Sequence, residues 1–287
     1  MKYVSAKTAL EYLCGEKEDL LSGVRTAVVV AHPDDEVCGL GSRLHRLRNA
    51  LFIYVTDGSP RNLDDAHREG FATREAYALA RRRELYSALT LAGIPVEQTR
   101  RLGFVDQEAA QNLVDLSMHL SNLLRDVQLV ITHAYEGGHP DHDSTAFAVH
   151  AGARLLRNRP CILEMASYHI RNGAIETSDF IQPNSGADHE ITTISLSSQE
   201  QYFKRRLFEC FPTQKETLTW FCFDAERFRP APNYDFTRPP HAGQLFYEKF
   251  NWGMTGEQWR ALAGRALQRL DKGLDFRRFR EDFFLQL

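Results

Sequence analysis

Three short apolar runs, separated by segments with helical periodicity, constrain the fold of this chain more than any other feature. They cover residues 25–31, 51–56 and 127–132, and their β-branched residues suit buried parallel strands. Helical patterns at residues 65–92 and 108–125 lie between them. Strands that alternate with helices in this way favour an α/β fold with a mostly parallel, doubly wound sheet.

The flanking segments extend this pattern at both ends. Residues 5–22 predict an amphipathic helix, and a Pro-Asn-Ser-Gly turn at 183–186 precedes a short strand at 191–196 and a helix around 198–210. An aromatic, Pro-bearing segment follows at 220–252, and residues 277–287 suggest a final helix or docked tail. At 287 residues and 43% hydrophobic composition, we expect one α/β domain with a C-terminal elaboration.

Charge and composition exclude several classes of partner. The net charge of -3 and the sequence pI near 6.4 give no basic field for nucleic acid or anionic membranes. No stretch approaches the roughly 20 apolar residues of a membrane helix, and the N-terminus lacks the pattern of a signal peptide. The five scattered cysteines include no CxxC pair, which indicates reduced thiols and a cytoplasmic protein.

Two polar motifs follow the first and third apolar runs. Residues 32–36 read His-Pro-Asp-Asp-Glu, and residues 139–142 read His-Pro-Asp-His. In a doubly wound sheet, loops at the carboxyl ends of the strands meet in one crevice. A catalytic zinc takes three protein ligands and keeps one open position, which predicts a site made by His32, Asp35 and His142.

The other polar residues of these motifs suit amide hydrolysis, which needs a base for the attacking water and an acid for the departing amine. Asp34, next to a ligand, is the predicted general base. His139 is predicted to stabilise the oxyanion or protonate the leaving nitrogen, with Asp141 raising its pKa and fixing its orientation. Glu36 is expected to cap the following helix or hold a ligand.

Each motif alone has a simpler interpretation as a helix start, with aspartate as cap and proline in the first turn. Two such motifs, each after its own apolar strand, are harder to explain as caps. Their joint presence favours the metal site.

The two motifs together resemble the signature pair of the PIG-L/LmbE-like zinc-dependent de-N-acetylases, which act on N-acetylglucosamine conjugates. Further similarities occur at residues 55–59, 81–84, 91–94 and 102–106, and the resemblance covers about residues 24–215. It implies a Rossmann-like fold, zinc, and the same roles for the motif residues. It also implies that Arg81 and Asp106 contact sugar hydroxyls, although Arg81 could equally be an i,i+3 partner of Glu84.

The sequence departs from the family pattern in the C-terminal elaboration, about residues 216–287, so the substrate stays open. Its aromatic residues suit either a sugar-binding wall or ordinary core packing. We predict removal of an N-acetyl group from an amino sugar or its conjugate. The alternatives are an amidase on another acyl amide, such as a thiol-cofactor conjugate, and a non-catalytic carbohydrate-binding protein with a structural metal. Iron or cobalt would suit the same ligands, and a homo-oligomer is compatible with the sequence.

Overall fold

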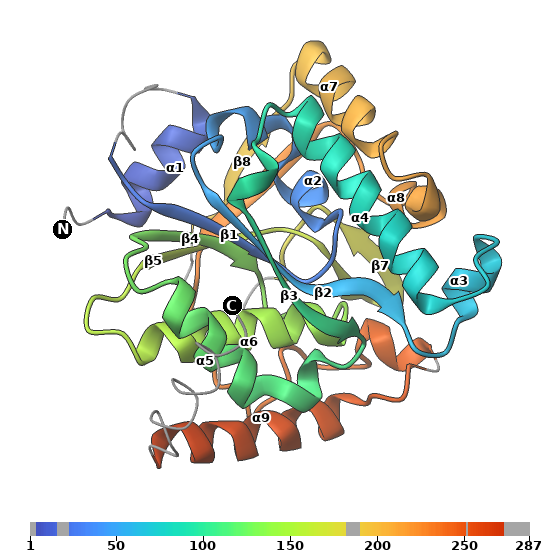
Figure 1. The fold of residues 1–287 in the computed structure, drawn as a ribbon. Coiled ribbons are helices and arrows are strands. Elements are labelled where there is room, and N and C mark those ends of the chain that lie inside the picture. Colours follow the sequence, from blue (N-terminus) through green and yellow to red (C-terminus); the bar gives the residue numbers. More distant parts are fainter. Residues whose placement is uncertain (1–3, 16–22, 182–189, 251, 273–287) are drawn as a thin grey trace.

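A central mixed sheet organises the part of the chain that the structure describes (Figure 1). The computed structural model describes residues 4–15, 23–181, 190–250 and 252–272. Within these ranges, the strands of the main sheet lie in the order β3-β2-β1-β4-β5-β9-β8. Their bounds are β1 Thr26–Val30, β2 Leu51–Pro60, β3 Thr99–Asp106, β4 Leu129–His133, β5 Cys161–Met165, β8 Thr192–Ser195 and β9 Ala225–Pro230.

The first five strands of this order are parallel, which confirms the mostly parallel, Rossmann-like sheet. β9 runs antiparallel to β5, and β8 runs antiparallel to β9. β1 pairs with β2 on one side and with β4 on the other, so the chain changes direction across the sheet between β1 and β4. Ligands of doubly wound proteins bind in the crevice at such a switch point.

Helices cover both faces of the sheet (Figure 1). One face carries α1 (Ala6–Cys14), α2 (Asp35–Leu40), α4 (Arg74–Leu91) and α7 (Ser198–Phe208). The other carries α5 (Leu113–Leu123) and α6 (Pro140–Arg154), with α9 (Gly256–Asp271) packed outside them. β1 shows why both layers form: Val28 and Val30 enter the first core, whereas Ala27 and Val29 enter the second.

Shorter elements connect these layers. They are the helices α3 (Asp64–Arg68) and α8 (Lys215–Leu218), the hairpin of β6 (Tyr168–Arg171) and β7 (Ala174–Thr177), and the 3-10 turns η1 (Gly41–Arg46), η2 (Val96–Gln98), η3 (Ala109–Asn112), η4 (Pro212–Gln214) and η5 (Phe246–Lys249). Within the described ranges, no helix has the length and apolar character needed to cross a lipid bilayer.

The last third of the chain forms hydrogen bonds with α2 and α6, the helices that follow β1 and β4. Trp259 of α9 is fully buried, and its indole N–H donates to the Pro140 carbonyl at the start of α6. Lys204 of α7 is also fully buried, and its ammonium donates to the Cys38 carbonyl of α2 and to Glu226 of β9. These contacts fix the positions of both helices.

The predicted strands at 25–31, 51–56, 127–132 and 191–196 are confirmed as β1, β2, β4 and β8, and the helix near 198–210 as α7. The single helix expected over 65–92 is wrong, because Gly70 adopts a φ of +78° and separates α3 from α4. The helix expected over 108–125 begins as a 3-10 turn. Of the helix expected over 5–22, α1 forms and ends at Gly15, whereas residues 16–22 lie outside the described residues. The turn at 183–186 and the tail at 277–287 lie outside them too.

Candidate active site

The loops that follow β1 and β4 lie side by side, because the two strands are neighbours in the sheet. Both predicted motifs therefore open into one cavity of about 270 Å³. His32, Asp35 and His142 line this cavity, together with Asp34 and His139. The structure thus brings together residues that lie about a hundred positions apart in the chain.

The three predicted metal ligands converge at the centre of the site. His142 Nε2 lies 3.1 Å from Asp35 Oδ1 and 3.3 Å from His32 Nδ1, and His32 Nδ1 lies 3.3 Å from Asp35 Oδ2. All three side chains are buried, and their potential ligand atoms lie within 4.8 Å of one another. Two imidazoles and one carboxylate form a donor set that suits zinc and other divalent transition metals.

The protonation preferences of these residues differ. Burial and the neighbouring His133 lower the pKa of His142 to about 3, although Asp35 opposes the shift. Burial raises the pKa of Asp35, but the three nearby histidines, His142, His133 and His32, lower it by more than burial raises it. The net pKa of Asp35 therefore lies well below its usual range. Burial alone would lower the pKa of His32, yet Asp106 and Asp35 raise it well above its usual value. A neutral imidazole and an anionic carboxylate are the forms that bind metal, and His32 Nδ1 must lose its proton to join them.

Asp34 occupies an unusual backbone conformation beside these ligands. Its φ is +136°, in a region that residues with a side chain rarely adopt. It precedes α2 without capping it, which argues against the helix-start interpretation for this residue. Its carboxylate instead accepts a hydrogen bond from Arg81 Nη2 at 3.0 Å, and its backbone N–H donates to Glu36 Oε2. Burial, partly offset by Arg81, raises the pKa of Asp34 to about 7.

His139 is the residue before α6 and acts as its N-cap. Its Nδ1 accepts the backbone N–H of Asp141 at 3.1 Å, so the proton of the neutral ring is on Nε2. Burial and the nearby His32 lower the pKa of His139 well below its usual value. His139 is therefore a neutral N–H donor in this arrangement.

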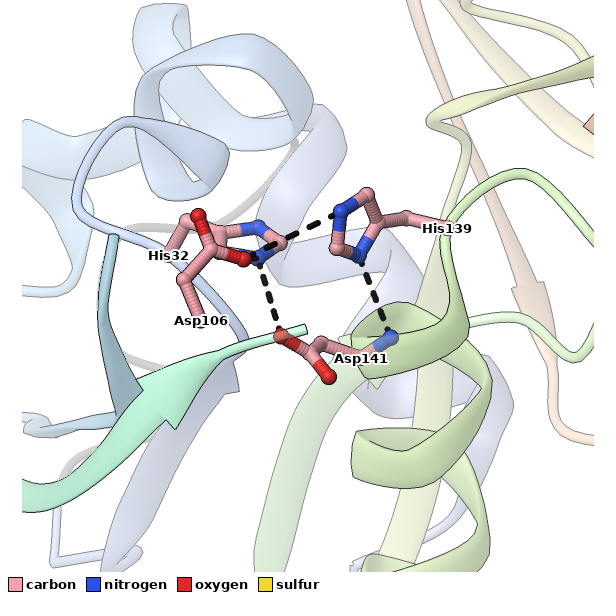
Figure 2. Close-up of side chains that lie close together, drawn as sticks. All are labelled: His32, Asp106, His139 and Asp141. Carbon is pink, nitrogen blue, oxygen red and sulfur yellow. Dashed lines mark hydrogen bonds and ion pairs between the residues drawn. The ribbon is translucent and has the colours of Figure 1, made fainter. Parts of the chain in front are cut away.

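The Asp141 carboxylate lies elsewhere than we expected. Its oxygens accept the backbone N–H groups of Gln107 and Ala109, and one lies 3.5 Å from His32 Nε2 (Figure 2). The backbone of Asp141, and not its carboxylate, contacts the His139 ring. The expected rise in the pKa of His139 is replaced by a decrease, since burial and His32 are its largest influences.

Asp106, at the end of β3, contacts the same nitrogen of His32. Its Oδ1 lies 3.1 Å from His32 Nε2 and 3.9 Å from His139 Nε2 (Figure 2). If Nε2 of His32 donates its proton to Asp106, Nδ1 faces Asp35 and His142 with a free lone pair. These four side chains, His32, Asp106, His139 and Asp141, also form a second group whose ligand-type atoms lie within 4.8 Å.

Arg81 extends from α4 into the loop after β1. Its guanidinium donates to the carbonyls of Gly58 and Pro33 as well as to Asp34. Glu84, its proposed helical partner, accepts instead from Thr213. Arg81 and Asp106 both line the cavity, where their contact with a sugar remains a prediction.

His133 is a component of the site that motif spacing did not identify. It stacks on His142 with ring centroids 4.0 Å apart, and its Nε2 lies 3.2 Å from Asp35 Oδ2. Nε2 also accepts the Ala31 N–H, and Nδ1 has no hydrogen-bond partner among the described residues. The available sequence signal was its position at the carboxyl end of a predicted strand, where residues of a doubly wound sheet face the ligand crevice. His169, the other histidine near a strand end, lies away from the site, between Glu136 and Glu176.

Solved structures with the same fold support this architecture. A deacetylase from teicoplanin biosynthesis shares 17% identity over 74% of this chain and 99% of its own, with a TM-score of 0.56. The A40926 pseudoaglycone deacetylase shares 19% identity over 72% and 96%, with a TM-score of 0.55. The N,N'-diacetylchitobiose deacetylase of Pyrococcus horikoshii shares 16% identity over 80% and 94%, with a TM-score of 0.50. At these identities the likeness shows the fold.

A search among curated proteins gave no match. Residues 27–153 match the family described as PIG-L, GlcNAc-PI de-N-acetylase, and this range contains both motif loops together with β3. The resemblance predicted from those motifs is thereby confirmed for residues 27–153.

Proposed function

We propose that the protein is a zinc-dependent hydrolase that removes the acetyl group from an N-acetylated amino sugar or its conjugate. The main supporting observation is the convergence of His32, Asp35 and His142 beside Asp34 and His139 in one cavity. The PIG-L domain supports this activity, and the three structural relatives are all described as deacetylases.

His32, Asp35 and His142 would hold the metal. Their donor set fits it, because the carboxylate is anionic, His142 is neutral, and Asp106 can retain the Nε2 proton of His32. A divalent metal supplies Lewis acidity, which polarises a carbonyl and acidifies water.

Asp34 is our proposed general base. Its carboxylate would accept a proton from the water that attacks the acetamide carbon. Arg81 fixes the orientation of Asp34, and the pKa near 7 matches a group that accepts and returns a proton at neutral pH.

His139 would interact with the oxygen or nitrogen of the amide. Because its ring is neutral with the proton on Nε2, it can donate a hydrogen bond to the developing oxyanion or assist protonation of the departing amine. Asp141 would support both histidines, through its backbone N–H for His139 and its carboxylate for His32. Overall, water and the amide give acetate and a free amine.

The test is amine release from a panel of N-acetyl sugars and conjugates by zinc-loaded protein. We expect activity to be lost in His142→Ala together with zinc binding, and to be lost in Asp34→Asn with zinc still bound, as measured by metal analysis. Asp115→Asn, which changes an exposed carboxylate of α5, is the matched control.

Two other outcomes would replace this proposal. Amine release from other acyl amides but not from acetamides would identify a different amidase. Sugar and zinc binding without hydrolysis of any amide would identify a carbohydrate-binding protein with a structural metal.

A further inference from the structure

The mouth of the active-site cavity has a wall of aromatic rings that the proposed chemistry does not use. Tyr168, Trp220, Phe250 and Trp252 line the cavity, and we call these four residues the aromatic wall. Trp220 is 41% exposed and Phe250 is 40% exposed. Large aromatic side chains that stay exposed in a concave site commonly mark a binding surface.

The two ends of the aromatic wall lie against His139, the proposed hydrogen-bond donor, and His142, a proposed metal ligand. Trp252 lies 4.7 Å from His139 between ring centroids, and Phe250 stacks on Trp252 at 4.5 Å and 12°. At the other end, Tyr168 lies 5.1 Å from His142 and 6.2 Å from Trp220. Phe246 joins the two ends, with contacts to both Phe250 and Trp220. A group attached to the reacting acetamido sugar would therefore meet these rings.

The charges around the cavity disfavour a phosphorylated substrate. Carboxylates outnumber arginines among the described residues that line it: Asp34, Asp35, Asp65, Asp106 and Glu216 against Arg68 and Arg81. Both arginines are already paired, Arg68 with Asp65 at 2.7 Å and Arg81 with Asp34 at 3.0 Å. A phosphate needs free cationic donors, and the described lining offers none away from the proposed metal, so an anionic group at the mouth of the cavity would meet repulsion.

We propose that the substrate is an acetamido sugar joined to an uncharged ring, and that this ring lies against the aromatic wall. The inference rests on the proposed function and names its substrate class. A second sugar ring and an aryl group share the required chemistry, a flat uncharged face that packs on aromatic side chains. Polar side chains at the same cavity, including Gln107 and Gln214, are available for hydroxyl groups.

Kinetics on matched glycosides of N-acetylglucosamine test this proposal. We expect kcat/KM for the phenyl glycoside and for N,N'-diacetylchitobiose to exceed that for the methyl glycoside about tenfold, mainly through KM. We expect N-acetylglucosamine 1-phosphate to be poorer than the methyl glycoside. A preference for the phenyl glycoside alone or for the disaccharide alone would identify which ring the wall accepts.

Two variants connect the preference to the wall. In Trp220→Ala and Phe250→Ala, the ratio of kcat/KM between phenyl and methyl glycosides should fall towards one. The control is Tyr202→Ala, which removes a ring that is 60% exposed on α7 and does not line the cavity. Equal ratios in wild type and wall variants, or a preference for the 1-phosphate, would overturn the proposal.

A binding measurement separates this proposal from the proposed function. Phenyl β-glucoside and methyl β-glucoside lack the acetamide, so calorimetric titration of the zinc-loaded protein reports the wall without hydrolysis. Tighter binding of phenyl β-glucoside that is lost in Trp220→Ala would support the wall even if no acetamide were cleaved. Acetamide cleavage with equal binding of both glucosides would retain the function and refute the wall.

Discussion

The two sides of the active-site cavity are held in place by different forces. On the side of β1 and β4, buried polar groups restrain one another, as Arg81 restrains Asp34 and Asp106 restrains His32. On the opposite side, Phe250 and Trp252 are held by ring stacking. Buried hydrogen-bond networks tolerate little change, whereas apolar contacts can be replaced by others. We therefore expect the first side to control the rate of reaction and the second to control the choice of substrate.

The largest effect should come from Asp34→Asn. This variant keeps the size of the side chain but removes the base, so we expect kcat to fall by about 10²- to 10⁴-fold. The decrease should be the same for phenyl and methyl glycosides, because the aromatic wall is unchanged. Steady-state kinetics at saturating zinc measure this. A change in the ratio between the two substrates would contradict the separation of the two sides.

The next effect concerns Glu136 in the loop after β4, where Arg229 lies 3.2 Å away. Burial, partly offset by Arg229, raises its pKa to about 7 from the ordinary 4.5. Between these values the folded protein holds a proton that the unfolded chain has released, so the free energy of unfolding falls as the pH rises through this range. The loss is at most about 3 kcal/mol.

Denaturant unfolding between about pH 5 and about pH 8 would reveal this dependence. Glu136→Gln should show a shallower dependence than wild type. Glu75→Gln is the matched control, since the Glu75 side chain is 79% exposed. If the pH dependence of the free energy of unfolding were the same in Glu136→Gln as in wild type, Glu136 would not be a buried group that titrates in this range.

A smaller effect is expected from Asp106→Asn. The neutral amide oxygen accepts a hydrogen bond from His32 Nε2 more weakly than the carboxylate does, so the His32 ring is held less firmly. Zinc affinity should therefore fall about 10- to 100-fold. Competition with a chromogenic chelator measures the affinity without reference to activity. If zinc affinity in Asp106→Asn equalled that of wild type, Asp106 would not orient His32 for the metal, and only its predicted contact with the sugar would remain.

The smallest effect should come from Phe250→Leu on the aromatic wall. An aliphatic side chain keeps an apolar surface but loses ring stacking, so the phenyl glycoside should bind about 2- to 10-fold more weakly. Zinc affinity should stay at the wild-type value. A loss of zinc in this variant would show that the two sides of the cavity are energetically coupled.

The sequence predicted the polar side of the cavity far better than the aromatic side. His32, Asp35 and His142 were predicted to converge because each motif follows an apolar strand, and sheet topology places the two loops together. The aromatic wall has no such signal, because aromatic residues in a Pro-rich segment are as typical of a core as of a binding surface. Trp220 and Trp252 reach the same cavity only through long-range packing.

The missed fold elements have similar causes. β3 contains three consecutive polar or charged residues at 99–101, and β5 begins with a cysteine in a short run, so neither shows the strong apolar pattern of β1. β9 contains three charged residues among six, and its buried Glu226 and Arg229 pair with Lys204 and Glu164. Local pattern cannot predict partners that come from distant segments.

The backbone of Asp34 has a consequence for engineering. A φ of +136° costs a residue with a side chain on the order of 1–3 kcal/mol, whereas glycine adopts such conformations readily. Glycine at position 34 would remove this backbone cost, but it would also leave the buried Arg81 without its carboxylate partner and would remove the proposed base. Any programme that seeks a more robust form of this protein has to score turnover and melting temperature together, because backbone relief and loss of the Asp34 carboxylate occur at the same position.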